Sequence, residues 1–232
     1  MTRQLSKWLE NYINAKAELL EGLATDGTLI LNSDDNIINK IDLSPFKGSI
    51  IYFGIKNRAH FSATDIEYEN EGMKFTLHNQ NKSYSVYVPG YGEHNVYNAL
   101  AAIAATHSIG IGINESINWL TSFKPVRQHM QCRPGINGCT IIDDTWNCTP
   151  LSMESAIQVL KDLGKSKTTI AVFGYMPRLG AAGNPEYYRI GEKVAEAGID
   201  LVLTIGDEAA IIGQQAIKTG LNKNRAFFCD SV

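Results

Sequence analysis

Residues 92–102 read GEHNVYNALAA. From Val96 onward, apolar residues recur at helical spacing: Val96, Ala99, Leu100, Ile103 and Ala104. That spacing predicts a helix with one buried face. Asn95 stands where a side-chain oxygen can cap the N–H groups of the first turn, so we expect the helix to begin beside it.

A helix start of this kind would gather His94, Asn95 and Asn98 at one end of a rigid rod. Amides and an imidazole carry both donors and acceptors, which suits recognition of the polar edge of a purine. The same residues are also compatible with an ordinary capped helix in which they satisfy only backbone groups. This stretch alone leaves both interpretations open.

Composition describes a soluble globular chain with enough length for one large or two modest domains. Of 232 residues, 44% are hydrophobic and 19% are charged, and the formal net charge is −3. A net negative charge does not indicate binding to nucleic acid or to an anionic membrane surface. No apolar run approaches the length of a membrane span, and the charged amphipathic N-terminus is not a signal peptide.

The four cysteines form neither a C-x-x-C pair nor a zinc-binding spacing. They are Cys132, Cys139, Cys148 and Cys229. We interpret them as free thiols in a reducing compartment, which predicts a cytoplasmic protein.

The first half is predicted to be mixed α/β. An amphipathic helix spans the apolar residues from Leu5 to Leu23, and residues 28–32 form a buried strand. Further β-type runs fall at residues 49–55, 63–68, 73–78 and 84–88. The last three are expected to form an antiparallel meander, and helices follow after Asn95 and at 114–123.

A domain boundary is expected between Phe123 and Pro134, dividing the chain into residues 1–124 and 125–232. Beyond it, strands and helices alternate. The strands are expected at 140–143, 168–173, 201–205 and 225–229, and the helices at 151–163, 187–197 and 208–219. This alternation predicts right-handed crossovers onto a parallel, Rossmann-like sheet, and hence an α/β fold class.

Ligands of such sheets gather at the carboxyl ends of the strands. The residues expected at those ends are Asp143 and Asp144, Gly174 and Tyr175, and Gly206 and Asp207. Position therefore favours a functional role, although an acidic residue after a strand is also a common helix cap.

Three stretches resemble segments of the Mur ligases, which build the peptide of the bacterial cell wall. They are G-x-H-N-x-x-N-A at 92–99, IIDDTWNCTP at 141–150 and VFGYMPRLG at 172–180. The nearest branch is the MurF type, which adds D-alanyl-D-alanine to a UDP-linked muramoyl tripeptide. The resemblance implies the C-terminal part of a central ATPase domain at 1–124 and an incomplete C-terminal Rossmann-like domain at 125–232.

The resemblance implies an ATP-dependent amide synthesis through an acyl phosphate, with Mg²⁺ as the metal. His94, Asn95 and Asn98 resemble the adenine-side contacts. Asp144 resembles the carboxylate that holds the ribose hydroxyls, and Asn147 the amide of the same loop. The alternative for Asp144 is a helix-capping acid. The substrates implied are a nucleotide and a UDP-muramoyl-peptide-like acid.

Lys16 resembles the family lysine that carries a carbamate, whose oxygens would bind Mg²⁺. A neutral lysine amine adds CO₂ and so exchanges a cation for an anion. Without the family context, a lysine on an amphipathic helix is a solvated charge.

Several positions depart from the family pattern. No phosphate-binding G-x-x-x-x-G-K-[ST] loop occurs, so we expect the chain by itself to be inactive. Gln128 and His129 stand where the family has Gly-Arg, and a neutral imidazole lacks the fork of donors of a guanidinium. His129 is the candidate nucleotide contact at this place, and Arg127 is a possible substitute for the arginine.

Four further departures lie in the second half. Trp146 replaces a tyrosine and Thr149 an asparagine, while Tyr175 and Arg178 replace two acids. Three hypotheses remain open: part of a Mur-type ligase whose phosphate loop lies upstream, a non-catalytic paralogue that binds nucleotide or a protein partner, and a ligase with a different acid and amine pair.

Overall fold

The computed structural model describes residues 2–177, 179 and 183–230, with side chains from Glu10 onward. Contacts divide the chain into two compact units, Met1–Lys124 and Pro125–Val232. Arg178 lies outside the described residues. No helix in the described part is both long enough and apolar enough to cross a membrane.

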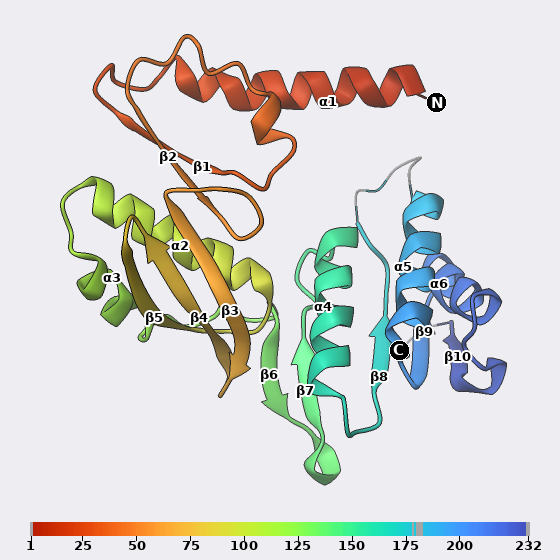
Figure 1. The fold of residues 1–232 in the computed structure, drawn as a ribbon. Helices are drawn as coiled ribbons and strands as arrows, with labels where there is room; N and C mark the ends of the chain where they lie inside the picture. Colours follow the sequence, from red (N-terminus) through yellow and green to blue (C-terminus); the bar gives the residue numbers. More distant parts are fainter. Residues whose placement is uncertain (1, 178, 180–182, 231–232) are drawn as a thin grey trace. The chain divides into compact units, whose positions relative to one another are not determined.

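The first unit contains a five-stranded sheet together with several helices (Figure 1). Its elements are α1 (Thr2–Ala17), η1 (Glu18–Leu20), β1 (Thr28–Asn32), η2 (Ile38–Lys40), β2 (Ser49–Gly54), β3 (Phe61–Glu69), β4 (Gly72–Asn79), β5 (Lys82–Pro89), α2 (Glu93–Ser108) and α3 (Ile113–Leu120). Every predicted strand of this half is present, and the helix predicted at 114–123 corresponds to α3.

The sheet has the order β1-β2-β3-β4-β5 and mixes two kinds of pairing. β1, β2 and β3 run parallel, whereas β3, β4 and β5 form the predicted antiparallel meander. A bulge between Thr64 and Glu67 interrupts the β3–β4 ladder, and Asp65 there has a φ of 52°. A bulge of this kind bends the strand and increases its twist.

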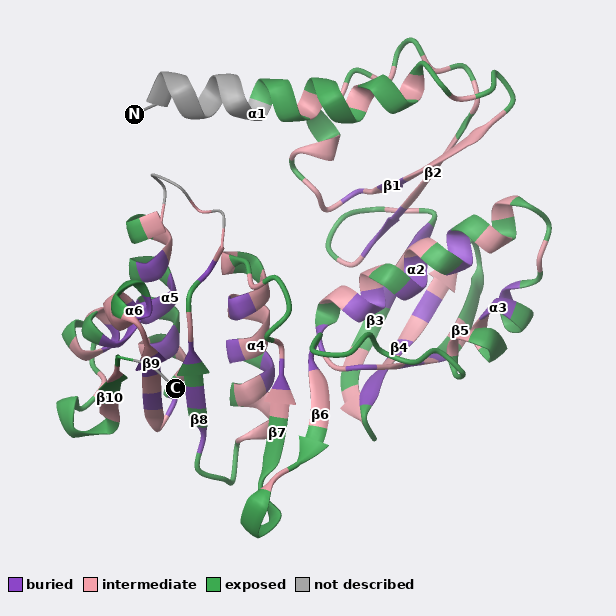
Figure 2. Ribbon diagram, turned by 180° about the vertical axis from the view of Figure 1, so that it is seen from behind, coloured by how far each residue is buried: buried purple, intermediate pink, exposed green. Residues whose placement is uncertain are grey.

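Helix α2 lies across the sheet and contacts all five strands. Its buried face holds the five predicted apolar residues, of which Val96, Leu100 and Ile103 are fully buried. Figure 2 shows this face in purple against β3 and β4. The start of the helix was predicted wrongly. Gly92 is the N-cap, with a φ of 102°, and Asn95 lies inside the first turn and caps nothing. A glycine supplies this positive φ without steric cost.

The second unit alternates strands and helices as predicted (Figure 1). Its elements are β6 (Gln131–Pro134), η3 (Ile136–Gly138), β7 (Thr140–Asp143), α4 (Pro150–Leu163), β8 (Ile170–Phe173), α5 (Gly183–Ala197), β9 (Leu201–Ile205), α6 (Asp207–Lys218), η5 (Lys223–Arg225) and β10 (Ala226–Cys229).

Three of its strands form the expected parallel sheet, in the order β10-β9-β8. Strand β7 forms where expected, but it pairs antiparallel with β6 in a separate two-stranded sheet. β6 was not predicted, because Gln131, Arg133 and Pro134 give it no apolar pattern. Its backbone pairing with β7 supplies the order instead.

A separate core holds the second unit together. Its fully buried members include Ile190 and Val194 on α5, Val202 on β9 and Ile212 on α6. α5 and α6 approach closely at Gly191, where an added Cβ would lie 2.6 Å from the carbonyl oxygen of Ile212. A side chain there would push the helices apart, so this glycine fixes their packing.

Candidate functional site

The first two turns of α2 contain the three polar residues expected to contact a nucleotide. Asn98 is exposed and His94 is half-buried, whereas Asn95 is only 9% exposed. The Asn95 Nδ2 donates to the carbonyl oxygen of Tyr91 at 2.9 Å. Asn95 therefore anchors the strand-to-helix connection in addition to any contact with a ligand.

Asp34, which follows β1, collects hydrogen bonds from two distant segments. Its Oδ2 accepts from the backbone N–H groups of Ile55 at 2.6 Å and Lys56 at 3.0 Å, and its Oδ1 from that of Asn57 at 2.7 Å. The Tyr97 hydroxyl on α2 donates to Oδ2 at 2.9 Å. One carboxylate thus joins the end of β1, the loop after β2 and the helix that carries the candidate nucleotide residues.

The electrostatics of this cluster favour the charged carboxylate. Burial acts to raise the pKa of Asp34, but the hydrogen bonds from Ile55, Lys56 and Tyr97 outweigh it and leave the pKa below its usual value. Burial, followed by the bond to Asp34, raises the pKa of Tyr97. Gly54 makes the close approach possible, because a Cβ there would lie 2.2 Å from the Ser33 hydroxyl oxygen.

Little in the sequence indicates this cluster. Asp34 lies two residues beyond the predicted strand at 28–32, and Tyr97 falls between the two motif residues His94 and Asn98. Positions 34, 55–57 and 97 are far apart along the chain, so no local pattern connects them. Paired acidic residues directly after a buried strand were the one available signal.

In the second unit, the β6–β7 pairing brings the predicted residues of two loops together. Gln131 pairs with Asp143 at the start of the ladder, so residues 128–130 lie beside residues 144–146. Asp144 Oδ1 accepts from the Met130 backbone N–H at 3.0 Å. The Trp146 backbone N–H donates to the Gln128 carbonyl oxygen at 3.2 Å.

These loops hold several residues in left-handed backbone conformations: Gln128 at 61°, Met130 at 48° and Asn147 at 50°. Such conformations cost a residue with a side chain about 1–2 kcal/mol and are common at functional sites. His129, between the first two, is exposed, as is Asn147. His129 and Asn147, two residues expected to contact a nucleotide, are therefore exposed on neighbouring loops. The hydrogen bond from Met130 to Asp144 connects these loops.

The two adjacent acids differ in their surroundings. Asp143 is 7% exposed, forms an ion pair with Arg133, and accepts from the Thr145 hydroxyl at 2.7 Å. Asp144 does not cap the following helix. Thr149 caps α4 in a reciprocal pair with Ser152, so the helix-cap alternative for Asp144 is wrong.

The remaining strand ends also fall where expected. β8 ends at Phe173 before Gly174 and Tyr175, and β9 ends at Ile205 before Gly206 and Asp207. Because β8 and β9 are parallel neighbours, these residues share one edge of the sheet. Tyr175 is 61% exposed there, and Asp207 begins α6.

Lys16 lies in the last turn of α1 and is exposed. Its Nζ lies 5.6 Å from the centre of the Tyr12 ring, a cation–π geometry. In the described part of the chain, Lys16 makes no ion pair and no three His, Cys, Asp or Glu side chains form a metal-binding group.

The mixed sheet of the first unit and the alternating strands and helices of the second define an α/β protein. Two family models match it in succession: the Mur ligase middle domain at residues 6–106, and the Mur ligase glutamate ligase domain at residues 129–232. The chain belongs to the Mur ligase family.

Relatives and solved structures agree with this placement. The UDP-N-acetylmuramoyl-tripeptide–D-alanyl-D-alanine ligase of Escherichia coli is 31% identical over 88% of this chain and 45% of its own length. The crystal structure of MurF from Acinetobacter baumannii is 26% identical, with a TM-score of 0.81 over 95% of this chain and 46% of that one.

A MurF ligase from Thermotoga maritima, solved in complex with ADP, shares the fold at 20% identity, with a TM-score of 0.75. It covers 96% of this chain and 54% of that one. The chain spans less than half the length of the curated relatives that it matches.

Proposed function

We propose that this chain is part of an ATP-dependent amide ligase that acts in the cytoplasm in the synthesis of peptidoglycan precursors. The observation that carries the proposal is the match, over most of the chain, to relatives named as D-alanyl-D-alanine-adding ligases. The substrates would be a UDP-muramoyl-peptide-like acid, a dipeptide amine and ATP.

The proposed reaction has two steps. An oxygen of the acid's carboxylate attacks the γ-phosphorus of ATP, and ADP leaves. The amine nitrogen then attacks the acyl carbon of the acyl phosphate. The bond between that carbon and the bridging oxygen breaks, inorganic phosphate leaves, and the nitrogen loses a proton to give the amide. Most of the catalysis in such a reaction comes from positioning and charge neutralisation.

In this proposal α2 contributes the contacts to the base. The exposed Asn98 amide and the half-buried His94 ring supply donors and acceptors at one helix end. The Nδ2 of Asn95 donates a hydrogen bond to the carbonyl oxygen of Tyr91, so we assign its Oδ1 to the ligand. The Asp34–Tyr97 bond holds this turn in place.

The second unit contributes the contacts to the sugar and phosphates. Asp144 is assigned to the ribose hydroxyls, since a carboxylate accepts hydrogen bonds from hydroxyl groups and this one lies in the motif loop beside Met130. His129 and Asn147, exposed on the adjoining loops, are assigned to the nucleotide beside it.

Binding of ADP to the 232-residue chain, measured by calorimetry in the presence of Mg²⁺, tests the assignment. Asp144→Asn keeps an acceptor for Met130 but loses the charge, and we expect it to weaken binding about tenfold, the scale of a charge-assisted hydrogen bond. Asp230→Asn, an exposed acid of the same unit, serves as the control and should bind ADP unchanged. Absence of ADP binding, or equal affinity of both variants, would refute the assignment.

Lys16 is proposed to carry a carbamate that faces the metal. Mg²⁺, when bound, would neutralise charge on the transferring phosphate. The exposed Nζ is accessible to CO₂, and Lys16→Arg cannot form the adduct. A ¹³C resonance that appears in ¹³CO₂-enriched buffer and is lost in Lys16→Arg would support the modification. A resonance that persists in the variant would exclude Lys16 as its site.

A further inference from the structure

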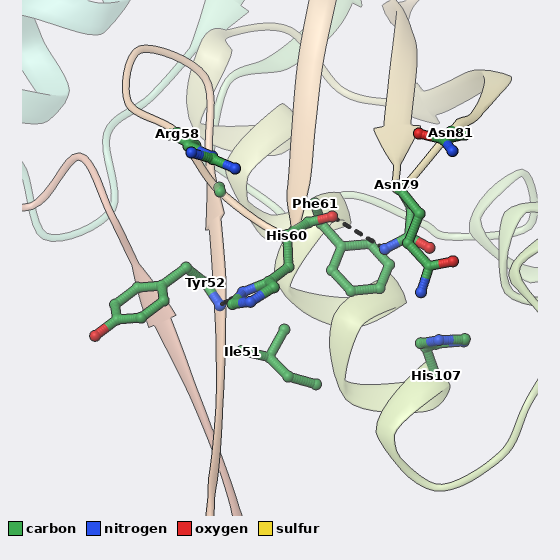
Figure 3. Close-up of a pocket in the computed structure, with 10 residues that line it drawn as sticks. Ile51, Tyr52, Arg58, His60, Phe61, Asn79, Asn81 and His107 are labelled. Carbon is green, nitrogen blue, oxygen red and sulfur yellow. Dashed lines mark hydrogen bonds between the residues drawn. The ribbon is translucent and has the colours of Figure 1, made fainter.

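A cavity of about 790 Å³ opens at the opposite end of α2 from the candidate nucleotide residues. It lies between the loop after β2, the turn between β4 and β5, and the last turn of α2 (Figure 3). His107 lines it, thirteen positions beyond His94 on the same helix. At 1.5 Å per residue this separation is about 20 Å, so the cavity is distinct from the nucleotide candidates.

None of the ten residues that line the cavity is acidic, although the chain has 24 Asp and Glu residues. Arg58 contributes a guanidinium, His60 and His107 contribute imidazoles, and Asn79 and Asn81 contribute amides. A smaller adjoining cavity of about 330 Å³ is also lined without an acid. It adds Lys82, so the basic lining continues. Such a lining attracts negative charge.

His60 is fixed in one orientation. Its Nδ1 accepts from the Tyr52 backbone N–H at 2.9 Å, and its ring stacks on that of Tyr52. A ring nitrogen that accepts an N–H carries no proton, so in the neutral ring the proton lies on Nε2. The Asn79 Nδ2 donates to the His60 carbonyl oxygen at 3.0 Å and ties the β4–β5 turn to this residue.

Two further donor groups at the cavity have no partner among the residues whose side chains are described. In the described part of the chain, the Arg58 guanidinium and the His107 ring nitrogens make no hydrogen bond or ion pair. The centres of the His107 and Phe61 rings lie 5.5 Å apart in an edge-to-face arrangement, and the buried Phe61 gives the cavity an apolar wall. Cavities that combine an apolar wall with a few convergent donors are typical of small-molecule sites.

We propose that this cavity binds a small organic anion, whose phosphate or carboxylate group contacts Arg58 and His60 and whose body rests on Phe61. Arg58 supplies a planar fork of donors that matches either group. The site is independent of the ligase assignment, because none of the proposed nucleotide residues lines the cavity.

The test follows the imidazole ¹⁵N–¹H signals of the five histidines while the chain is titrated with inorganic pyrophosphate or, separately, with citrate. We expect the signals of His60 and His107 to shift and to saturate with one of the probes. Tighter binding of pyrophosphate would identify a phosphate ligand, and tighter binding of citrate would identify a carboxylate ligand. Arg58→Gln should weaken that response at least about tenfold.

Lys40→Gln is the matched control, since it removes the same charge from an exposed position of the same unit that does not line the cavity. It should leave the affinity unchanged, and the amide spectrum should show that both variants stay folded. The proposal is overturned by shifts confined to His94 and His129, by the absence of saturation at millimolar probe, or by equal weakening in the two variants.

Discussion

Gln128 adopts a φ of 61° at the place where the family pattern has glycine, and His129 follows it where the pattern has arginine. The exposed imidazole has no permanent charge to offer a phosphate. We predict that His129→Arg tightens ADP binding by up to about 1–3 kcal/mol, the scale of a charge-assisted hydrogen bond. Calorimetry measures the change.

Gln214→Arg is the control for this substitution, because it adds the same charge at an exposed position on α6. It should leave ADP affinity unchanged. If His129→Arg has no effect, or if both variants tighten binding equally, His129 does not face the nucleotide.

Asp34 makes the stability of the first unit depend on pH. Its pKa in the folded chain lies below the usual value because the bonds from Ile55, Lys56 and Tyr97 outweigh burial. A lowered folded-state pKa contributes stability that is fully present above the unfolded-state value near 3.8, and that is lost as the pH falls through the folded-state value.

We therefore predict that Asp34→Asn lowers the free energy of unfolding at neutral pH by about 2–3 kcal/mol. The loss of stability between about pH 6 and about pH 3 should be smaller in this variant than in the unchanged chain. Urea denaturation at several pH values measures both quantities. Asp26→Asn, an exposed acid with no hydrogen bond in the described part of the chain, should keep the full pH dependence. An unaltered pH dependence in Asp34→Asn would contradict the role assigned to this carboxylate.

At the scale of elements, Thr149 shows how a departure from the family pattern preserves a structural role. Its side chain accepts from the Ser152 backbone N–H at 3.1 Å, and Ser152 Oγ accepts from the Thr149 backbone N–H at 2.9 Å. Asparagine and threonine both cap helices, so the exchange retains the start of α4. We predict that Thr149→Ala lowers the free energy of unfolding by about 1 kcal/mol, whereas Thr149→Asn changes it by a few tenths. Chemical denaturation distinguishes the two, and an equal loss in both would show that capping is not the cause.

The helices and strands were predictable where the apolar period is local, as in α2 and in β8 to β10. The start of α2 was misplaced, because the sequence does not show that Gly92 takes a positive φ and lets the helix begin before Asn95. β6 was missed because its order comes from pairing with β7. Within the candidate site, His129, Asp144 and Asn147 could be proposed from motifs. The Asp34–Tyr97 bond could not, since its partners are 63 residues apart.

At the scale of the whole molecule, the described residues form one buried core in each unit. Leu100 is fully buried in the core of the first unit, and Ile212 is fully buried in that of the second. Truncation of a buried Leu or Ile to Ala costs about 2–5 kcal/mol, because it leaves a cavity as well as losing apolar contacts. The two residues therefore provide a matched pair of substitutions, one for each core.

We predict that Leu100→Ala speeds amide hydrogen exchange in β3 to β5 and leaves β8 and β9 unchanged, while Ile212→Ala does the reverse. Local stability is set by the packing of each cooperative unit, so a cavity in one core lowers the opening free energy of that unit alone. Hydrogen exchange followed by mass spectrometry resolves the two sets of strands. Equal acceleration in both units by either variant would mean that the cores open together, and the chain would then unfold as one cooperative body despite its two separate cores.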